Sequence, residues 1–151
     1  MPSTTYFFLH IPHTAGTTVA EHIKSNLKKE EYLELQYNML DLPTKTPSHK
    51  EYLRAVKKYA YSISKTKRRK IRVVFGHVVP WGSHKFFEGK ANYVTFMRDP
   101  VLRAVSTYNF HRTRYDLQPR DRGKEDVTRP LLVNGKIPEY KEWLKTKWGT
   151  T

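Results

Sequence analysis

The chain has 151 residues, of which 28 are Lys or Arg and 14 are Asp or Glu, so its formal net charge is +14. This length fits one domain with a buried core, and an aromatic content of 13% argues against a disordered chain. The absence of cysteine excludes disulfide scaffolds, thiolate metal sites and cysteine nucleophiles. No apolar run approaches the roughly 20 residues of a membrane-spanning helix, and the N-terminus does not resemble a signal peptide. We therefore expect a soluble, basic, cytoplasmic domain.

The positive charge is distributed unevenly along the chain. Residues 1–50 carry equal numbers of acidic and basic side chains, whereas the excess begins at Arg54 and peaks in the run from Lys65 to Arg72. Such a run indicates an anionic partner, which can be a nucleotide, a polysaccharide, a nucleic acid or a lipid headgroup. A solvated loop without a ligand is an equally good interpretation.

The first half of the chain predicts two strands and two helices. A short run of aromatic and apolar side chains predicts a buried strand over residues 6–11. Helical spacing of apolar residues then predicts a helix that begins near Thr17, and a short strand is expected within residues 32–40. The capping-box sequence of residues 48–51 predicts a second helix that ends near Ser64.

The second half continues this alternation. Apolar runs predict strands over residues 71–75 and 92–97, separated by a loop with one turn of helix. Pro100 suits the first turn of the next helix. Residues 116–136 are polar and rich in turn formers, so we expect mostly loop there, followed by a terminal helix over 138–148. Strands that alternate with helices are typical of a parallel sheet covered by helices.

The first motif, HIPHTAGTT at residues 10–18, lies between the first predicted strand and its helix. Its small residues allow backbone N–H groups to approach a ligand, and Gly16 permits a tight turn. Thr17 and Thr18 place hydroxyls beside the positive end of the helix. These are the components of an anion-binding loop, although the Walker A spacing and its Lys are absent. Taken alone, the segment is equally an ordinary turn with a threonine N-cap.

The second motif, RDPVLRAVSTY at residues 98–108, follows the last predicted strand. Arg98 at the strand end can pair with a phosphate, and Ser106 lies two helical turns later, where it can provide a second oxygen contact. Asp99 can cap the helix. Taken alone, this is also compatible with a structural junction in which Arg98 makes a surface ion pair.

Together, the two motifs resemble the nucleotide-binding signatures of the sulfotransferase superfamily, in particular the carbohydrate-type branch related to heparan sulfate sulfotransferases. In that branch one strand ends in H-x-P-K-T-[AG]-G-T-T and a later strand ends in R-D-P-x-x-R-x-x-S-x-Y. The resemblance covers residues 6–18 and 92–108, and more weakly the Gly-His pair at 76–77. It implies a P-loop-NTPase-like three-layer α/β fold, with a central parallel sheet flanked by helices, as a single domain over residues 1–151. Catalytic domains of the family are longer, so the resemblance leads us to expect a minimal form or one truncated at its C-terminus.

The resemblance also implies the donor and the residues that bind it. The expected donor is 3′-phosphoadenosine 5′-phosphosulfate (PAPS), and its product is adenosine 3′,5′-bisphosphate (PAP). The residues that match the loop around the 5′-phosphosulfate are His13, Thr14, Ala15, Gly16, Thr17 and Thr18. Arg98 and Ser106 match the pair that binds the 3′-phosphate, which distinguishes this donor from ATP. The reaction requires no metal, and no acidic metal cluster is visible in the sequence.

Two histidines are the predicted catalytic residues. His77 follows a predicted strand and Gly76, and an imidazole can accept a hydroxyl proton near neutral pH, so His77 is the candidate general base. A structural histidine that holds the loop is the alternative, and His84 and His10 are weaker candidates. His13 stands where most relatives have a Lys whose charge lies near the leaving oxygen, but a histidine there is shorter and only partly charged.

These features predict a PAPS-dependent sulfotransferase that transfers a sulfuryl group to a hydroxyl acceptor, with a carbohydrate as the expected acceptor. Positioning, charge stabilisation and a base for the acceptor hydroxyl supply most of the catalysis in such a transfer. The run from Lys65 to Arg72, with Trp81 and Lys85, is a candidate for holding an acidic or sugar acceptor. The alternative function is a non-catalytic module of the same fold that binds PAPS, PAP or a polyanion. Nucleic-acid binding is a third hypothesis, which no recognised motif supports.

Overall fold

The computed structural model describes residues 4–42, 47–117 and 137–146. The chain divides into two compact units, residues 1–97 and residues 98–151, which we call the sheet unit and the helical unit. The sheet unit contains all the described strands, whereas the helical unit contains α4 (Pro100–Leu117) and the short α5 (Tyr140–Trp143). The single domain expected from the length of the chain stays a prediction.

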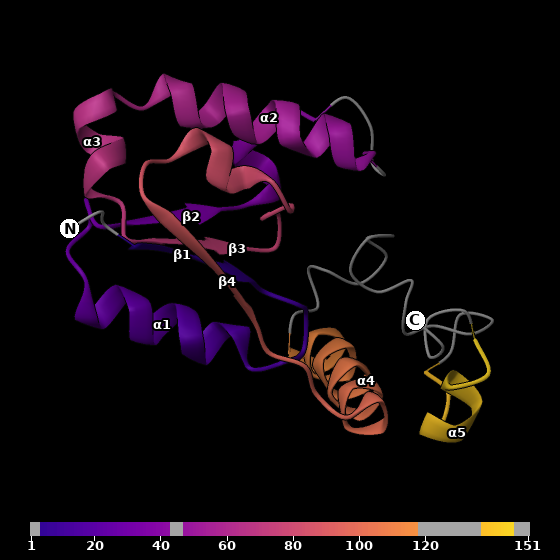
Figure 1. Ribbon diagram of the computed structural model, residues 1–151. Helices are drawn as coiled ribbons and strands as arrows, with labels where there is room; N and C mark the ends of the chain where they lie inside the picture. The colour runs from indigo at the N-terminus through magenta and orange to yellow at the C-terminus, as the bar shows by residue number, and fades with distance from the viewer. Residues whose placement is uncertain (1–3, 43–46, 118–136, 147–151) are drawn as a thin grey trace. The chain divides into compact units, whose positions relative to one another are not determined.

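The sheet unit is built around four parallel strands in the order β2-β3-β1-β4 (Figure 1). These strands are β1 (Thr4–Leu9), β2 (Tyr32–Leu35), β3 (Val73–Gly76) and β4 (Lys90–Thr95). Their carboxyl ends are level, because Leu9 is in register with both Gly76 and Thr95, and Leu35 is in register with Gly76. The residues that follow the strands therefore emerge at one edge of the sheet.

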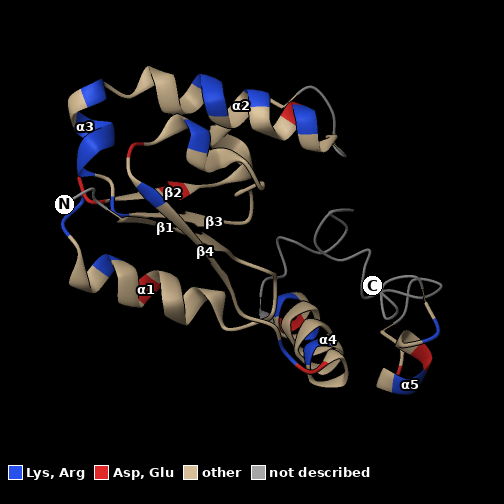
Figure 2. Ribbon diagram, viewed as in Figure 1, with Lys and Arg blue, Asp and Glu red and all other residues tan. Residues whose placement is uncertain are grey.

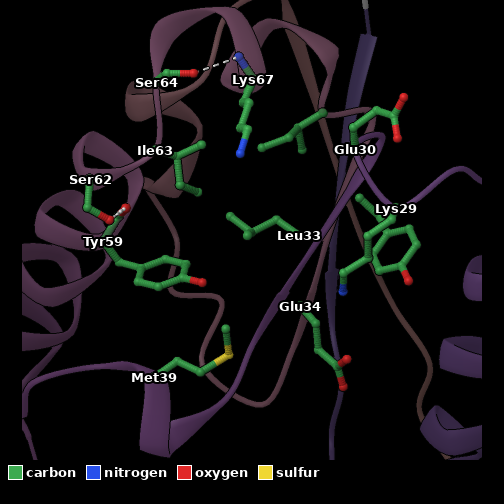
Figure 3. Close-up of a pocket in the computed structure, with 12 residues that line it drawn as sticks. Lys29, Glu30, Leu33, Glu34, Met39, Tyr59, Ser62, Ile63, Ser64 and Lys67 are labelled. Atoms are coloured by element: carbon green, nitrogen blue, oxygen red, sulfur yellow. Dashed lines mark hydrogen bonds between the residues drawn. The ribbon is translucent and has the colours of Figure 1, made fainter.

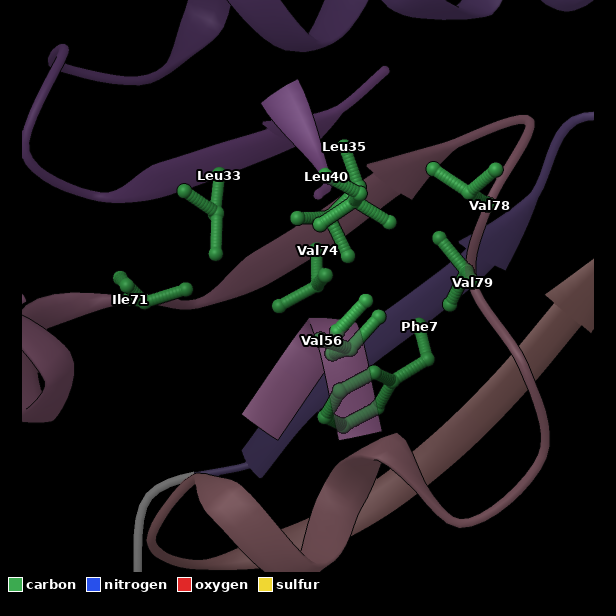
Figure 4. Packing of buried hydrophobic residues seen from close by; sticks show 10 residues of the cluster. Phe7, Leu33, Leu35, Leu40, Val56, Ile71, Val74, Val78 and Val79 are labelled. Atoms are coloured by element: carbon green, nitrogen blue, oxygen red, sulfur yellow. The ribbon is translucent and has the colours of Figure 1, made fainter. Parts of the chain in front are cut away.

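Helices cover both faces of this sheet. Figure 1 shows α1 (Gly16–Asn26) on one face and α2 (His49–Ser62) on the other. The core between the sheet and α2 includes Phe7, Val56 and Val74, each with 0% of its surface exposed (Figure 4). This arrangement confirms the predicted P-loop-like α/β fold with a central parallel sheet flanked by helices.

The ends of the strands differ from the sequence prediction, and the strand predicted over residues 71–75 lies later, at Val73–Gly76. The strands predicted over residues 6–11 and 92–97 each begin and end two residues earlier, at Thr4–Leu9 and Lys90–Thr95. The apolar side chains continue beyond the last paired residue, so hydrophobicity does not mark where the hydrogen-bonded pairing ends. The strand expected within residues 32–40 is confirmed but ends at Leu35, and a 3₁₀ turn, η1 (Tyr37–Met39), follows it.

The basic run forms a short helix, α3 (Lys65–Lys70), so the interpretation as a loop is wrong. Arg68 links this helix to the one before it, because its Nη1 donates hydrogen bonds of 2.9 Å to the carbonyl oxygens of Ala60 and Ile63. The carbonyl oxygen of Ala60 also accepts a hydrogen bond of 3.3 Å from the backbone N–H of Ile63, and carbonyls at a helix end commonly take side-chain donors of this kind. The sequence around Arg68 therefore serves the fold.

The helical unit begins as predicted. The backbone N–H of Leu102 donates to Asp99 Oδ1 at 3.0 Å, which confirms Asp99 as a cap of α4. Trp143 of α5 has 1% of its surface exposed and packs on Tyr108 of α4. The terminal helix is shorter than the predicted 138–148, and the loop predicted over 116–136 lies outside the described residues from 118 onward. Among the helices that are described, none is long and apolar enough to cross a membrane.

Candidate functional site

The loop of the first motif connects β1 to α1 at the carboxyl edge of the sheet. Its backbone is left-handed at two residues that are not glycine, His13 with φ of 65° and Ala15 with φ of 64°. Between them Thr14 is buried, and its hydroxyl donates a hydrogen bond of 2.7 Å to the carbonyl oxygen of Ile11. Because this hydroxyl proton is already used, Thr14 holds the loop together and offers a ligand only its backbone N–H.

The start of α1 has the properties of an anion site. Ala15 is the N-cap residue, so the alternative of a threonine N-cap is wrong, and no described side chain caps the first turn. This turn contains no acidic side chain, while Thr17 and Thr18 are exposed. Unsatisfied N–H groups and the partial positive charge at a helix start favour a phosphate or a sulfate.

Gly16 is required by the position of the His10 side chain. A Cβ at Gly16 would lie 1.7 Å from Cδ2 of His10, so the imidazole ring covers the first residue of α1. The same ring stacks on His77, with the ring centroids 4.1 Å apart. Burial, together with the charges of His77 and His13, lowers the pKa of His10. His10 is therefore a neutral framework side chain between the loop and His77.

His77 reaches the same edge of the sheet through a glycine turn. Gly76 has φ of 139°, and a Cβ there would lie 2.0 Å from the carbonyl oxygen of Leu35, so a side chain does not fit. His77 Nδ1 lies 3.0 Å from the carbonyl oxygen of His10. Since a carbonyl only accepts hydrogen bonds, Nδ1 carries the proton and Nε2 of the neutral ring has the free lone pair. Nε2 has no hydrogen-bond partner among the described residues, as a general base requires.

A cavity of about 410 Å³ lies beside His77 and has aromatic walls. Tyr37, Tyr52 and Trp81 line it, and the ring of Tyr37 is nearly parallel to the imidazole of His77, at 17° and a centroid distance of 6.5 Å. The sequence predicts a short strand within residues 32–40 and gives Tyr37 no role, whereas the chain leaves the sheet after Leu35. The only available signal was that Tyr37 follows a strand end. These walls suit an acceptor with a flat or weakly polar ring.

His84 and Lys85, which the sequence also singled out, lie on a 3₁₀ turn, η2 (Ser83–Phe86). Both the backbone N–H and Nδ1 of His84 contact the hydroxyl of Tyr93, at 3.1 and 3.2 Å. These contacts give His84 a structural role at the turn. Neither residue lines the cavity beside His77.

The basic run is separated from this cavity along the sheet. Figure 2 shows Lys and Arg gathered on α2 and α3. Arg69 forms an ion pair with Glu88 at 2.8 Å, and Arg72 forms one with Glu31 at 3.2 Å. The run precedes the amino end of β3, and His77 follows its carboxyl end, so the length of the strand, about 13 Å, lies between them. The basic run therefore does not line the cavity that contains His77.

The second motif lies in the helical unit, and we describe its residues relative to that unit only. Arg98 is exposed and precedes the cap residue Asp99. Ser106 is partly buried on α4, about 9 Å along the helix axis from Pro100 at 1.5 Å per residue. The guanidinium of Arg98, just before α4, and the hydroxyl of Ser106, two turns into it, are donors that a phosphate can accept from.

Comparison with protein families matches the chain to the sulfotransferase family over residues 2–149. A search of curated proteins and a search of solved structures each found no match. The matched residues include both motifs, the glycine turn and His77, and they account for almost the whole chain. The chain therefore belongs to the sulfotransferase family.

Proposed function

We propose that this protein transfers the sulfuryl group of PAPS to a hydroxyl group, with a carbohydrate as the expected acceptor. Membership of the family supports sulfuryl transfer in general and implies a nucleotide donor and an acceptor. One observation carries the proposal: an uncapped helix start and an imidazole with a free Nε2 lie at the same edge of one sheet. The first can bind an anion and the second can accept a proton.

The residues of the loop fit the phosphosulfate end of this donor. The N–H groups at the start of α1 and the hydroxyls of Thr17 and Thr18 are hydrogen-bond donors, and no acidic side chain in the first turn repels an anion. Thr14, Ala15 and Gly16 contribute their backbones. When bound, PAPS supplies an activated sulfuryl group attached to a phosphate leaving group. We assign the 3′-phosphate to Arg98 and Ser106 on the strength of the family resemblance.

In the proposed mechanism His77 is the general base. Its Nδ1–H is held by the His10 carbonyl, so Nε2 can accept the proton of the acceptor hydroxyl as the hydroxyl oxygen attacks sulfur. His10, with its lowered pKa, is neutral near pH 7 and adds no charge that opposes protonation of His77. His13, when protonated, stabilises the negative charge that develops on the leaving oxygen. Tyr37 and Trp81 provide flat faces beside His77 for a sugar ring.

The second candidate function is a module that binds PAPS or PAP and does not catalyse transfer. The observation that favours it is His13, which replaces the Lys of most relatives with a shorter side chain of lower charge. Transfer of radiolabelled sulfate from PAPS to an acceptor glycan distinguishes the two candidates, because only the enzyme produces labelled glycan.

Thermal denaturation with PAP, AMP and ATP tests the assignment of the donor site. A ligand that binds only the folded state raises the melting temperature, and the contact with the 3′-phosphate should make the rise largest for PAP. Arg98→Ala should reduce the difference between PAP and AMP. The matched control is Arg54→Ala, which removes the same charge from an exposed position on α2 and should leave that difference unchanged. Equal shifts for the three nucleotides would contradict the assignment.

A further inference from the structure

A second cavity, of about 970 Å³, lies between β2 and the end of α2 (Figure 3). In the described sheet β2 is an edge strand, so no further strand covers this side. The volume is at the upper end of the range of small-molecule pockets, about 300–1,000 Å³. This cavity shares no lining residue with the cavity beside His77. It is therefore a separate site from the one proposed for sulfuryl transfer.

The interior of this second cavity is mainly apolar. Figure 3 shows the side chains of Leu33, Ile63 and Met39 directed into it from β2, from the end of α2 and from η1. Met39 keeps 39% of its surface exposed, although methionine usually lies in protein interiors. An apolar ligand that covers these side chains would gain the free energy of burying them.

Two polar groups point into the cavity and have no side-chain partner. Figure 3 shows the ammonium group of Lys67 and the hydroxyl of Tyr59 directed toward its centre. Neither group makes an ion pair or a side-chain hydrogen bond within the described part of the chain. Lys67 thus differs from Arg68 and Arg69 beside it, which both bind other residues of the protein.

The other charged groups around the cavity are already balanced or directed elsewhere. The carboxylate of Glu34 pairs with Lys24 at 2.7 Å, and the ammonium of Lys29 lies over the ring of Tyr32, 4.8 Å from its centroid. Figure 3 shows the carboxylate of Glu30 directed away from the cavity. Of the charged side chains that line the cavity, Lys67 is therefore the one whose ammonium is directed toward its centre, beside the hydroxyl of Tyr59.

We propose that this cavity binds a small molecule with an apolar body and a single acidic group, such as a medium-chain carboxylate. The apolar body covers Leu33, Ile63 and Met39, while the acidic group pairs with Lys67 and accepts a hydrogen bond from Tyr59. Lys67 is exposed, so a neutral molecule of the same shape would leave its ammonium in water and would not gain the ion pair, and the acid should bind more tightly.

Isothermal titration of the full chain with decanoate and with its neutral counterpart decanol, both below their aggregation limits, tests this proposal. Decanoate should bind more tightly than decanol. Lys67→Met keeps the apolar stem and removes the charge, so it should weaken decanoate binding about fivefold, the upper range for a solvent-accessible ion pair, and leave decanol binding unchanged. Lys65→Met is the matched control, because Lys65 lies on the same helix, is exposed and does not line the cavity. Tyr59→Phe, which removes only the hydroxyl, should also weaken decanoate binding.

Several results would overturn the proposal. Equal affinity for decanoate and decanol would show that the cavity does not recognise the acidic group. An equal loss of decanoate affinity in the Lys65 and Lys67 variants would show that only the net charge of the protein matters. Displacement of decanoate by PAP would mean that it binds at the proposed donor site instead. Binding to phosphatidylglycerol vesicles without binding of decanoate would assign the same chemistry to a lipid surface. The nucleotide melting shifts are measured independently, so failure here is distinct from failure of the proposed transferase function.

Discussion

Replacing His77 with Asn separates the two roles of its imidazole ring. The amide N–H of Asn lies near the position of Nδ1, so it can still donate to the carbonyl oxygen of His10, whereas no basic nitrogen remains at the position of Nε2. If His77 is the general base, the rate of sulfuryl transfer should fall by about 10²–10⁴-fold. The melting shift with PAP should be unchanged, because His77 is not among the residues assigned to the donor.

The structure also sets the expected effect on stability. The bond from Nδ1 to the His10 carbonyl is 3.0 Å long and partly buried, and losing such a hydrogen bond costs about 0.5–1.5 kcal/mol. His77→Ala loses this bond together with the stacking on His10, so its melting temperature should fall by roughly 2–6 °C. His77→Asn should stay closer to the wild type, since it keeps the hydrogen bond.

The assay is the initial rate of transfer from radiolabelled PAPS at saturating donor, with the PAP melting shift measured for each variant. His84→Asn serves as the control, because His84 contacts Tyr93 and does not line the cavity beside His77. His77→Asn with a rate close to that of the wild type would refute the role of general base. A variant that loses both transfer and the PAP shift would point to a damaged fold, and the structural role of His77 would then explain the loss.

Three further predictions concern the first motif. His13→Lys should extend transfer to higher pH, because Lys keeps its charge there. His13→Ala should lower the rate far more than it weakens nucleotide binding. Superimposable pH–rate profiles for the wild type and both variants would contradict both expectations. Because the pKa of His10 is lowered in the folded state, the unfolded state binds more protons as the pH falls below about 6.5, so the free energy of unfolding should decrease from there through the folded pKa. In urea titrations at several pH values this decrease should be smaller for His10→Asn, and an identical pH dependence would count against it. Gly16→Ala should destabilise the fold by about 1–3 kcal/mol and slow transfer, since the added Cβ would lie 1.7 Å from the His10 ring that stacks on His77. An unchanged melting temperature would disprove this packing argument.

The layers of the fold were predictable because each element carries a local signal. The capping box of Ser48 and Glu51 is formed as the sequence predicts, and α4 begins at Pro100 behind its Asp99 cap. The strand ends were not predictable in this way, because apolar residues such as Phe96 continue past the last pair of the sheet. Pairing with a neighbouring strand, which the local sequence does not encode, decides where a strand ends.

The sequence shows that the run from Lys65 to Arg72 is strongly basic, but it does not show what each of these side chains binds. Six consecutive residues of this run form α3, in which Arg68 donates to the carbonyls of Ala60 and Ile63 at the end of α2 and Arg69 pairs with Glu88. The sequence shows how much charge is present, but the partner of each side chain depends on which elements pack beside it. Of the basic residues in this run, Lys67 alone lines the second cavity, and its ammonium points into that cavity.

The sequence by itself determined the alternation of strands and helices and the two motifs, and through them the sulfotransferase family, because these features depend on residue type and spacing along the chain. Only the tertiary structure decided that Nδ1 of His77 meets the carbonyl of His10, a residue 67 positions away, and that Tyr37 joins the wall of the cavity beside it. Both contacts follow from the register that makes the strand ends level. Register and side-chain direction are properties of the packed sheet, and no local stretch of sequence specifies them.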